Sequence, residues 1–275
     1  MLWLALATLL EVTPANIPQG QVAQVKAPSA AESIRFNGRV LPLFSNSDGS
    51  KYGLVPVPAL EPPGKKTIEV LNGAREVVER GILDVRDARF RTQNVTLGKA
   101  QTGLKPAPGE METVAALRKT ISPVRYWSEP FVVPTPGCLT SPYGVLRMHN
   151  GKPTGSYHSG VDQRGAEGVP IRAISEGVVR IVKKFNVHGD TVGIDHGQGV
   201  TSIYLHMSKF EASEGLQVKK GDIIGYVGTT GRSTAPHLHW GLNVHGIPVN
   251  PLQWMNLTEC APKPAAPKRK VKKKS

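Results

Sequence analysis

The stretch TAPHLHWG, residues 234–241, places two histidines two positions apart between a proline and a tryptophan. Side chains two residues apart on a β-strand point to the same face. If the HLHW segment is extended, His237 and His239 therefore project together. Two imidazoles on one face can bind a metal or move protons, but they need partners from elsewhere in the chain.

Two other segments supply such partners. YHSGVD, residues 157–162, contains His158 and Asp162, and YLHMS, residues 204–208, contains His206. Catalytic zinc sites commonly use three His, Asp or Glu ligands and keep a fourth position for water. Three ligands and two spare histidines match this inventory. Spacing alone leaves a second interpretation open, in which these are scattered strand and turn histidines with satisfied hydrogen bonds.

The region around these segments has the composition of a β domain. By count, 19 of the 29 glycines fall between Gly137 and Gly246, and glycine interrupts helices while it favours turns. Short apolar runs such as GVVRIVKKF, TVGIDHG, VTSIYLHMS and DIIGYVG alternate with these glycines. The sequence therefore predicts a mainly β fold, with a compact β domain over residues 137–260.

The preceding part is expected to form a separate β domain and a connector. KTIEVLNGAREVVERGILDVR alternates apolar and polar residues around Asn72-Gly73, which predicts a hairpin. Residues 21–97 are interpreted as an immunoglobulin-like β-sandwich. Residues 98–136 are interpreted as a short connector with one helix, on which Val114, Leu117 and Ile121 share a face.

The two ends of the chain have separate interpretations. Residues 1–20 contain an apolar run, Leu2 to Leu10, that is too short for a transmembrane span and favours an export segment, although a buried strand stays possible. The net charge is +13, and residues 261–275 hold seven Lys or Arg and no acid. This tail is expected to be disordered, and either aids solubility or binds anionic envelope polymers. No nucleic-acid motif is present, and a monomer is expected.

Cys138 and Cys260 enclose the glycine-rich region almost end to end. In an exported protein this arrangement favours a disulfide, and two free thiols are the alternative. Two cysteines cannot build a zinc site by themselves, so a metal here depends on histidine and carboxylate ligands.

Four segments together resemble one enzyme family. SPYGVLRMHNGKPTGSYHSGVDQRGAEGVPIRAISEGVVRIV, GDTVGIDHGQGVTSIYLHMS, VKKGDIIGYVGTTGRSTAPHLHWGL and PVNPLQW, between Ser141 and Trp254, are similar to the lysostaphin/LytM-type zinc metallopeptidases that cut bacterial cell-wall peptides. The resemblance rests on H-x-x-x-D, on the YLHMS segment and on H-x-H. It implies a lysostaphin-like antiparallel β peptidase domain, preceded by a β domain as in some members.

The resemblance also implies a role for each residue of the pattern. His158, Asp162 and His239 would be the ligands of one Zn²⁺. His206 and His237 would be catalytic, and the resemblance leaves open which of them is the general base. Ala235 stands where many members have glycine, outside the ligand set.

The implied function is zinc-dependent hydrolysis of amide bonds in peptidoglycan stem peptides or cross-bridges, in the periplasm or cell envelope. Relatives that lose ligands act as regulators of other hydrolases, so a non-catalytic wall-binding module is the alternative, and the retention of all five positions favours catalysis. A carrier-like domain is disfavoured because no modifiable lysine occupies the relevant turn, and general proteolysis stays open.

Other residues near these motifs receive weaker assignments. His196 is interpreted as a turn residue, and His149, His188 and His245 as loop residues without a metal role. Trp240 is expected to pack in the core, with a place in the substrate groove as the alternative. The remaining expectations are that Arg147 or Asn150 touches substrate, and that residues 141–156 and the loop after Phe210 form the groove walls.

Overall fold

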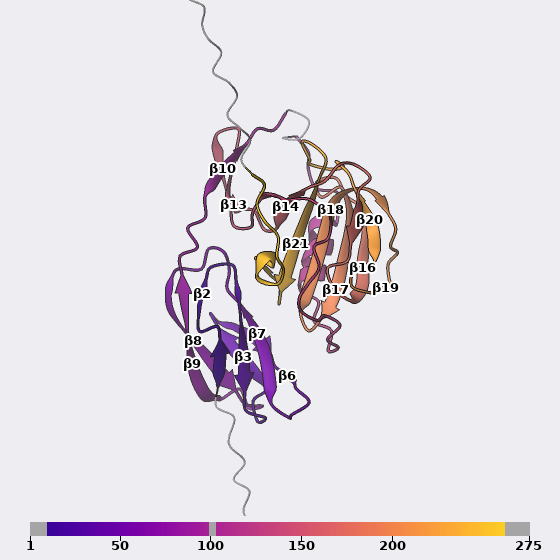
Figure 1. Cartoon of the computed structure of the whole chain (residues 1–275). Coiled ribbons are helices and arrows are strands. Elements are labelled where there is room, and N and C mark those ends of the chain that lie inside the picture. Colours follow the sequence, from indigo (N-terminus) through magenta and orange to yellow (C-terminus); the bar gives the residue numbers. More distant parts are fainter. Residues whose placement is uncertain (1–9, 99–102, 262–275) are drawn as a thin grey trace, which may run out of the picture.

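The computed structural model describes residues 10–98 and 103–261. Figure 1 shows an N-terminal β-sandwich, coloured indigo to purple, beside a larger C-terminal β-sheet, coloured magenta to yellow. Among the described residues, α2 (Glu110–Arg118) is the only α-helix. No helix within these ranges has the length and apolar character needed to cross a membrane.

The N-terminal sandwich consists of two sheets that share one core. From Ala23 to Ala27, strand β3 alternates buried positions with more exposed ones, as expected for a strand with one face against a core. Buried residues of both sheets, among them Val25, Val55, Ile34 and Ile68, form one cluster. A two-sheet architecture is therefore present, and its immunoglobulin-like character stays a prediction. One sheet is ordered β1 (Glu11–Thr13), β3 (Val22–Ala27), β7 (Lys51–Pro56), β6 (Phe44–Ser45), and the other β2 (Asn16–Pro18), β9 (Val77–Arg86), β8 (Gly64–Leu71), β4 (Ser33–Phe36), β5 (Arg39–Pro42).

The predicted hairpin around Asn72-Gly73 is confirmed. Strands β8 and β9 pair antiparallel, and the backbone N–H of Asn72 donates to the carbonyl of Glu76 at 3.0 Å. The side chain of Asn72 closes the loop by accepting from the Glu76 N–H at 3.0 Å. The left-handed residue of this loop is Arg75, with φ of 63°.

Strand pairing moves both predicted limits of the sandwich. Strands β1 and β2 pair with β3 and β9, so the sandwich begins before residue 21. They are three-residue edge strands, too short to show a period of two in the sequence. At the other end, β10 (Thr92–Val95) pairs in parallel with β12 (Leu146–His149) and so leaves the sandwich, whose last strand is β9.

Two predictions concern residues that lie partly outside the described ranges. Of the predicted export segment, residues 1–20, residues 1–9 are outside the described chain. The basic tail, residues 261–275, lies outside it from residue 262 onward.

The C-terminal part is built around one large sheet whose central strands are buried on both faces. All eight residues of β17 are buried, and the core contains Tyr204 and Trp240. The strands of the sheet's main path lie in the order β11 (Leu139–Ser141), β14 (Val161–Arg164), β21 (His237–Val244), β18 (Val200–Phe210), β17 (Asp190–Gly197), β16 (Gly177–Lys184), β19 (Gln217–Val218). Three further strands join this path: β20 (Ile223–Val227) pairs with β18, β15 (Pro170–Arg172) pairs with β20, and β22 (Ile247–Val249) pairs with β21. A short 3₁₀ helix, Pro251–Gln253, follows, and β13 (Lys152–Tyr157) joins β12 and β10 in a separate sheet.

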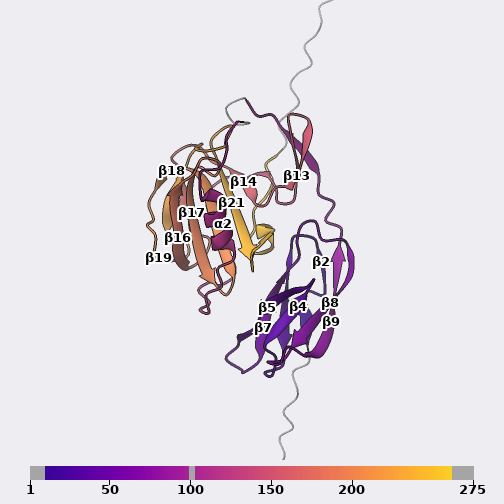
Figure 2. The same ribbon diagram turned by 180° about the vertical axis from the view of Figure 1, so that it is seen from behind.

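Helix α2 packs against the large sheet, as Figure 2 shows from behind. Val114 and Leu117 are buried in a cluster that includes Ile181 of β16, so this part of the predicted apolar face is confirmed. The inclusion of Ile121 is wrong, because the helix ends at Arg118 and Ile121 is 47% exposed. Pro123 follows shortly after and disfavours a continued helix.

Hydrogen bonds of the Gln253 side-chain amide, called here the amide clasp, join the sandwich to the large sheet. Gln253 accepts a hydrogen bond from the Val22 N–H at 2.8 Å and donates one to the Val22 carbonyl at 2.7 Å. The Asn250 N–H donates to the carbonyl of Gly20 at 2.7 Å. Gly20 lies against the ring of Tyr143, where a Cβ atom would come within 2.4 Å of Cε1. This contact therefore requires glycine.

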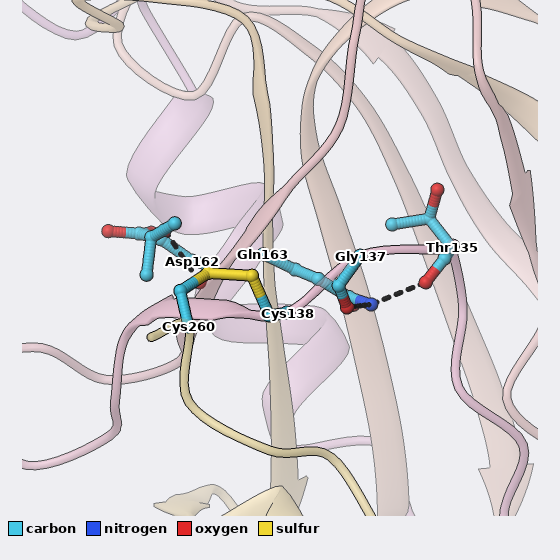
Figure 3. Close-up of a disulfide and its surroundings, with 7 residues drawn as sticks. Thr135, Gly137, Cys138, Asp162, Gln163 and Cys260 are labelled. Atoms are coloured by element: carbon cyan, nitrogen blue, oxygen red, sulfur yellow. Dashed lines mark hydrogen bonds between the residues drawn. A yellow bond between two sulfur atoms is a disulfide. The ribbon is translucent and has the colours of Figure 1, made fainter. Parts of the chain in front are cut away.

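The disulfide favoured by the sequence is present between Cys138 and Cys260. Figure 3 shows it beside Gln163 of β14, whose side-chain amide donates to the carbonyls of Thr135 and Gly137. The N–H of Cys260 also donates to the carbonyl of Leu139 at 2.9 Å. The disulfide therefore fastens the end of the described chain to the start of β11.

Replacing both cysteines by serine is expected to lower the free energy of unfolding by about 2–5 kcal/mol, because the bond closes a long loop in the unfolded chain. The two cysteines are 122 residues apart. Urea unfolding of the double variant and the wild type, both in the absence of reductant, measures this difference. Equal midpoints and equal slopes would contradict it.

Candidate metal centre

Three of the predicted residues meet at one end of strands β14 and β21. Asp162 lies on β14 directly opposite His239 on β21, and opposed residues of an antiparallel pair project to the same face. His158 lies just before β14, in the segment that leads into it. The local sequence thus brings a carboxylate and two imidazoles from distant positions to one point.

The facing atoms have the separations of a metal-ligand set. His158 Nε2 lies 3.0 Å from Asp162 Oδ1, and His239 Nδ1 lies 2.8 Å from the same oxygen. The two imidazole nitrogens are 3.0 Å apart. Donor atoms about 2.0 Å from a tetrahedral ion are separated by about 3.3 Å. The donor set of two nitrogens and one carboxylate oxygen therefore fits a small divalent cation such as zinc.

Hydrogen bonds on the far side of His158 and Asp162 orient the atoms that face the candidate ion site. A carbonyl oxygen only accepts, so the Nδ1 of His158 carries a proton that it donates to the Pro142 carbonyl at 2.9 Å, and Nε2 is the nitrogen that faces Asp162. Arg147 Nη2 donates to Asp162 Oδ2 at 3.0 Å, so Oδ1 is the oxygen that faces the imidazoles. Such outer contacts commonly orient metal ligands.

The protonation states also suit a metal. Burial alone would raise the pKa of Asp162, but the adjacent His158 and His239 outweigh it and hold that pKa well below its usual range. Burial lowers the pKa of His239 to about 4, although its hydrogen bond to Asp162 acts in the opposite direction. At neutral pH the carboxylate is ionised and the imidazole of His239 is neutral, the forms that bind metals.

His206 and His237 lie next to this group with a free nitrogen each. The Nδ1 of His206 donates to the Thr230 carbonyl at 2.8 Å, and that of His237 to the Ala235 carbonyl at 2.8 Å. Their ring centroids are 5.2 Å apart, and His237 Nε2 is 3.8 Å from Asp162 Oδ1. Both Nε2 atoms are therefore available for proton transfer or hydrogen bonding.

The environment of His206 keeps it neutral and holds it in an unusual conformation. Burial, with the neighbouring His239 and His237, lowers its pKa to about 3. Its φ is 60°, at an irregularity of β18. Non-glycine residues in this region cost about 1–3 kcal/mol and often occur at functional sites. The carbonyl that accepts the hydrogen bond of His206 belongs to Thr230, in the loop after β20. The GTTGRST segment therefore supports this imidazole as well as the H-x-H strand.

An open cleft of about 300 Å³ runs over these five side chains. From the predicted 141–156 wall it is lined by Arg147, His149 and Ser156. The predicted wall after Phe210 is wrong: among the described residues, none between Phe210 and Gly231 lines the cleft. His206 lies four residues before the end of β18, and at about 3.3 Å per residue the following loop is far from it. The second wall of the cleft is formed instead by Val187, His188 and Arg232 to Thr234.

His188 owes its place on the cleft wall to the connector helix. Glu110, fully buried at the start of α2, accepts hydrogen bonds from His188 Nδ1 at 2.6 Å and from the N–H groups of Asn186, Val187 and His188. Burial favours the neutral acid, but these donors outweigh it and lower the pKa of Glu110 to about 2. The sequence assigned His188 to a loop without a metal role, and it is absent from the candidate ligand group.

The remaining histidines and the tryptophan have structural surroundings. His196 is fully buried at the end of β17, and its Nδ1 donates to the Glu176 carbonyl at 2.7 Å, so its assignment to a turn is wrong. The actual turn is Gln198-Gly199. Trp240 is fully buried and stacks on Tyr204, which confirms core packing. His245 is buried too, whereas His149 lines the cleft.

The two candidate substrate contacts differ in position. Arg147 lines the cleft but its guanidinium is engaged by Asp162 and Gln93. Asn150 is absent from the cleft lining and holds Leu97 through hydrogen bonds to its N–H and carbonyl. Gln93 lies outside every recognisable motif, so no sequence pattern singles it out.

Comparison with known proteins identifies one family over this region. Residues 156–251 match the model of Peptidase family M23. The chain is 42% identical over 114 residues to the DD-carboxypeptidase/endopeptidase Mpg of Neisseria meningitidis, which is 42% of this chain and 26% of that protein. It is 36% identical over 115 residues to the peptidoglycan DD-endopeptidase ShyA of Vibrio cholerae, 42% of this chain and 27% of ShyA.

A third relative and one structure complete the comparison. The glycyl-glycine endopeptidase ALE-1 of Staphylococcus capitis is 44% identical over 88 residues, 31% of this chain and 24% of that protein. The chain therefore spans about a quarter of the length of these relatives. A crystal structure assigned to peptidase M23 from Pseudomonas aeruginosa has a TM-score of 0.64 and 26% identity, and covers 86% of this chain and 93% of that chain. That similarity extends over the N-terminal sandwich as well.

Proposed function

Because residues 156–251 form a domain of peptidase family M23, the lysostaphin/LytM-type metallopeptidases, we propose that this chain is a zinc-dependent endopeptidase that hydrolyses amide bonds in peptidoglycan peptides. The observation that carries the proposal is the convergence of three ligand atoms, from His158, Asp162 and His239, within 4.8 Å of one another at an open cleft. The relatives' names supply the substrate class.

The three ligands would hold one Zn²⁺, which when bound supplies a Lewis acid and a water whose pKa falls to about 7. Arg147 keeps Asp162 Oδ2 engaged, so Oδ1 stays directed at the ion. The Pro142 carbonyl fixes the His158 ring through Nδ1. These contacts orient the ligands before substrate arrives.

His206 and His237 would carry the protons of the reaction. With each Nδ1 donating to a carbonyl, each Nε2 is the ring nitrogen available for proton transfer or hydrogen bonding in the cleft. One imidazole accepts a proton from the attacking water at Nε2. The other stabilises the scissile carbonyl oxygen as it gains negative charge, which requires that ring to carry a proton on Nε2 as well as on Nδ1. The first imidazolium then protonates the leaving amine.

The substrate class follows from the relatives, whose printed names include both DD-endopeptidases and a glycyl-glycine endopeptidase. The same domain thus serves different peptidoglycan amides. Because peptidoglycan lies outside the cytoplasmic membrane, we place the protein in the periplasm or cell envelope. The disulfide between Cys138 and Cys260 agrees with an oxidising compartment.

Digestion of purified peptidoglycan sacculi with the zinc-loaded protein tests the proposal. Mass spectrometry of the released fragments is expected to show new amino and carboxyl termini on peptide stems or bridges, which also identifies the bond. A protein that binds zinc and sacculi but releases no fragment would contradict the hydrolase and favour a wall-binding regulator.

A further inference from the structure

Strand β10 contacts the residues behind the metal centre and lies outside residues 156–251, which match the family model. β10 pairs in parallel with β12, and Gln93 lies opposite Arg147 in that register. Figure 1 shows β10 and β13 together beyond the end of the sandwich. Gln93 and Val95 are the partly buried positions of β10, and Val95 lines the cleft. The face of β10 that carries Gln93 is therefore turned toward the site.

The amide oxygen of Gln93 receives two hydrogen bonds from groups behind the metal ligands. Arg147 Nη1 donates to Gln93 Oε1 at 3.0 Å, and Ser141 Oγ donates to the same oxygen at 3.0 Å. Arginine is a donor only, which fixes the orientation of the amide: its oxygen, not its nitrogen, faces Arg147. A single acceptor thus joins two donors that come from β12 and β11.

Each of these donors in turn contacts one ligand. Arg147 Nη2 binds Asp162 Oδ2 at 3.0 Å, and Ser141 Oγ lies 3.3 Å from His158 Nδ1. The serine hydroxyl has one proton, and that proton is directed to Gln93. Its oxygen is therefore an acceptor toward the His158 Nδ1–H, which also donates to the Pro142 carbonyl at 2.9 Å.

We propose that Gln93 is a positioning residue of the metal centre, which orients Asp162 through Arg147 and, through Ser141, supplies a second acceptor beside the Pro142 carbonyl for the His158 Nδ1–H. The inference rests on the proposed function in so far as the ion is zinc. Outer contacts of this kind change metal affinity by about 10–100-fold when removed. Gln93 lies outside residues 156–251, which match the family model, and also before Ser141, where the sequence resemblance begins.

Zinc affinity of full-length variants, measured by competition with a chelating dye at fixed pH, tests the inference. Gln93→Leu keeps the side-chain volume but removes the acceptor, and is expected to weaken zinc binding by about 10–100-fold. Gln93→Glu keeps an acceptor oxygen and is expected to stay within a few-fold of wild type. Because zinc binding is the readout, the result does not depend on finding the substrate.

A neighbouring position provides the matched control. Asn94 lies on the same strand, where its Oδ1 accepts from the Gly151 N–H at 2.8 Å, so Asn94→Ala disturbs the attachment of β10 without touching Arg147 or Ser141. Its zinc affinity is expected to equal that of wild type. Thermal melting in the presence of a chelator checks that each variant is folded, and Gln93→Asn replaces the leucine variant if the latter does not fold.

The outcomes separate the two proposals. A folded Gln93→Leu protein with wild-type affinity would overturn the inference and leave the proposed function intact. An equal loss of affinity in Asn94→Ala would also overturn it, because the effect would then belong to strand docking. A wild-type protein that binds no zinc would overturn the proposed function and, with it, the role of Gln93.

Discussion

His239→Ala is expected to weaken zinc binding by at least 100-fold and to reduce the release of peptidoglycan fragments by about 10³-fold or more. Both effects have one cause. The imidazole supplies one of three ligand atoms, 2.8 Å from Asp162 Oδ1 and 3.0 Å from His158 Nε2. A metal contributes several kcal/mol of stabilisation to such a transition state, and each 1.36 kcal/mol corresponds to a factor of ten in rate.

The measurement pairs zinc content after dialysis with the rate of fragment release from sacculi. His245→Gln serves as the control, because His245 follows the same strand but lies outside the ligand group. It is expected to keep both zinc and activity. If His239→Ala retained stoichiometric zinc at wild-type affinity, the assignment of the ligands would be wrong.

His206→Ala and His237→Ala are expected to reduce the catalytic rate by about 10²–10⁴-fold each while zinc remains bound. Neither imidazole belongs to the ligand group, and each has its Nδ1 occupied by a backbone carbonyl. The loss therefore appears in kcat. Because the two groups act in one step, the double variant is expected to lose much less than the product of the two single effects.

Steady-state kinetics on a soluble peptidoglycan fragment, together with zinc content, measures these changes. Thr234→Ala is a suitable control, because Thr234 lines the same cleft and is exposed. A His206 or His237 variant with full kcat would remove that residue from the catalytic step. A variant that lost zinc would instead show that the residue supports the ligands.

Local patterns predicted the mainly β character and the placement of His237 and His239 on one strand face, whereas the grouping of all five site residues was implied by the family resemblance. The alternation in H-x-H is a consequence of strand geometry, but the register that places Asp162 opposite His239 joins segments 77 residues apart. The hairpin at Asn72 followed from turn chemistry. The alternation and the hairpin depend on neighbouring residues, so the sequence carries them directly.

The contacts that the sequence did not reveal all join distant segments. Glu110 and His188 are 78 residues apart, and Gln93 and Arg147 are 54 apart. A lone glutamine in a four-residue strand has no period and no motif, so only the tertiary fold shows its neighbours. The same reason explains the sandwich limits, since β1, β2 and β10 are defined by their partners and not by their own composition.

The amide clasp at Gln253 has a mechanical consequence. The sandwich is attached to the large sheet there, through Val22, and also by the five residues that separate β9 from β10. With such a short tether, a displacement of the sandwich would also shift the strand that carries Gln93, and with it the side chains that orient Asp162. A sandwich on a long flexible linker would leave them in place.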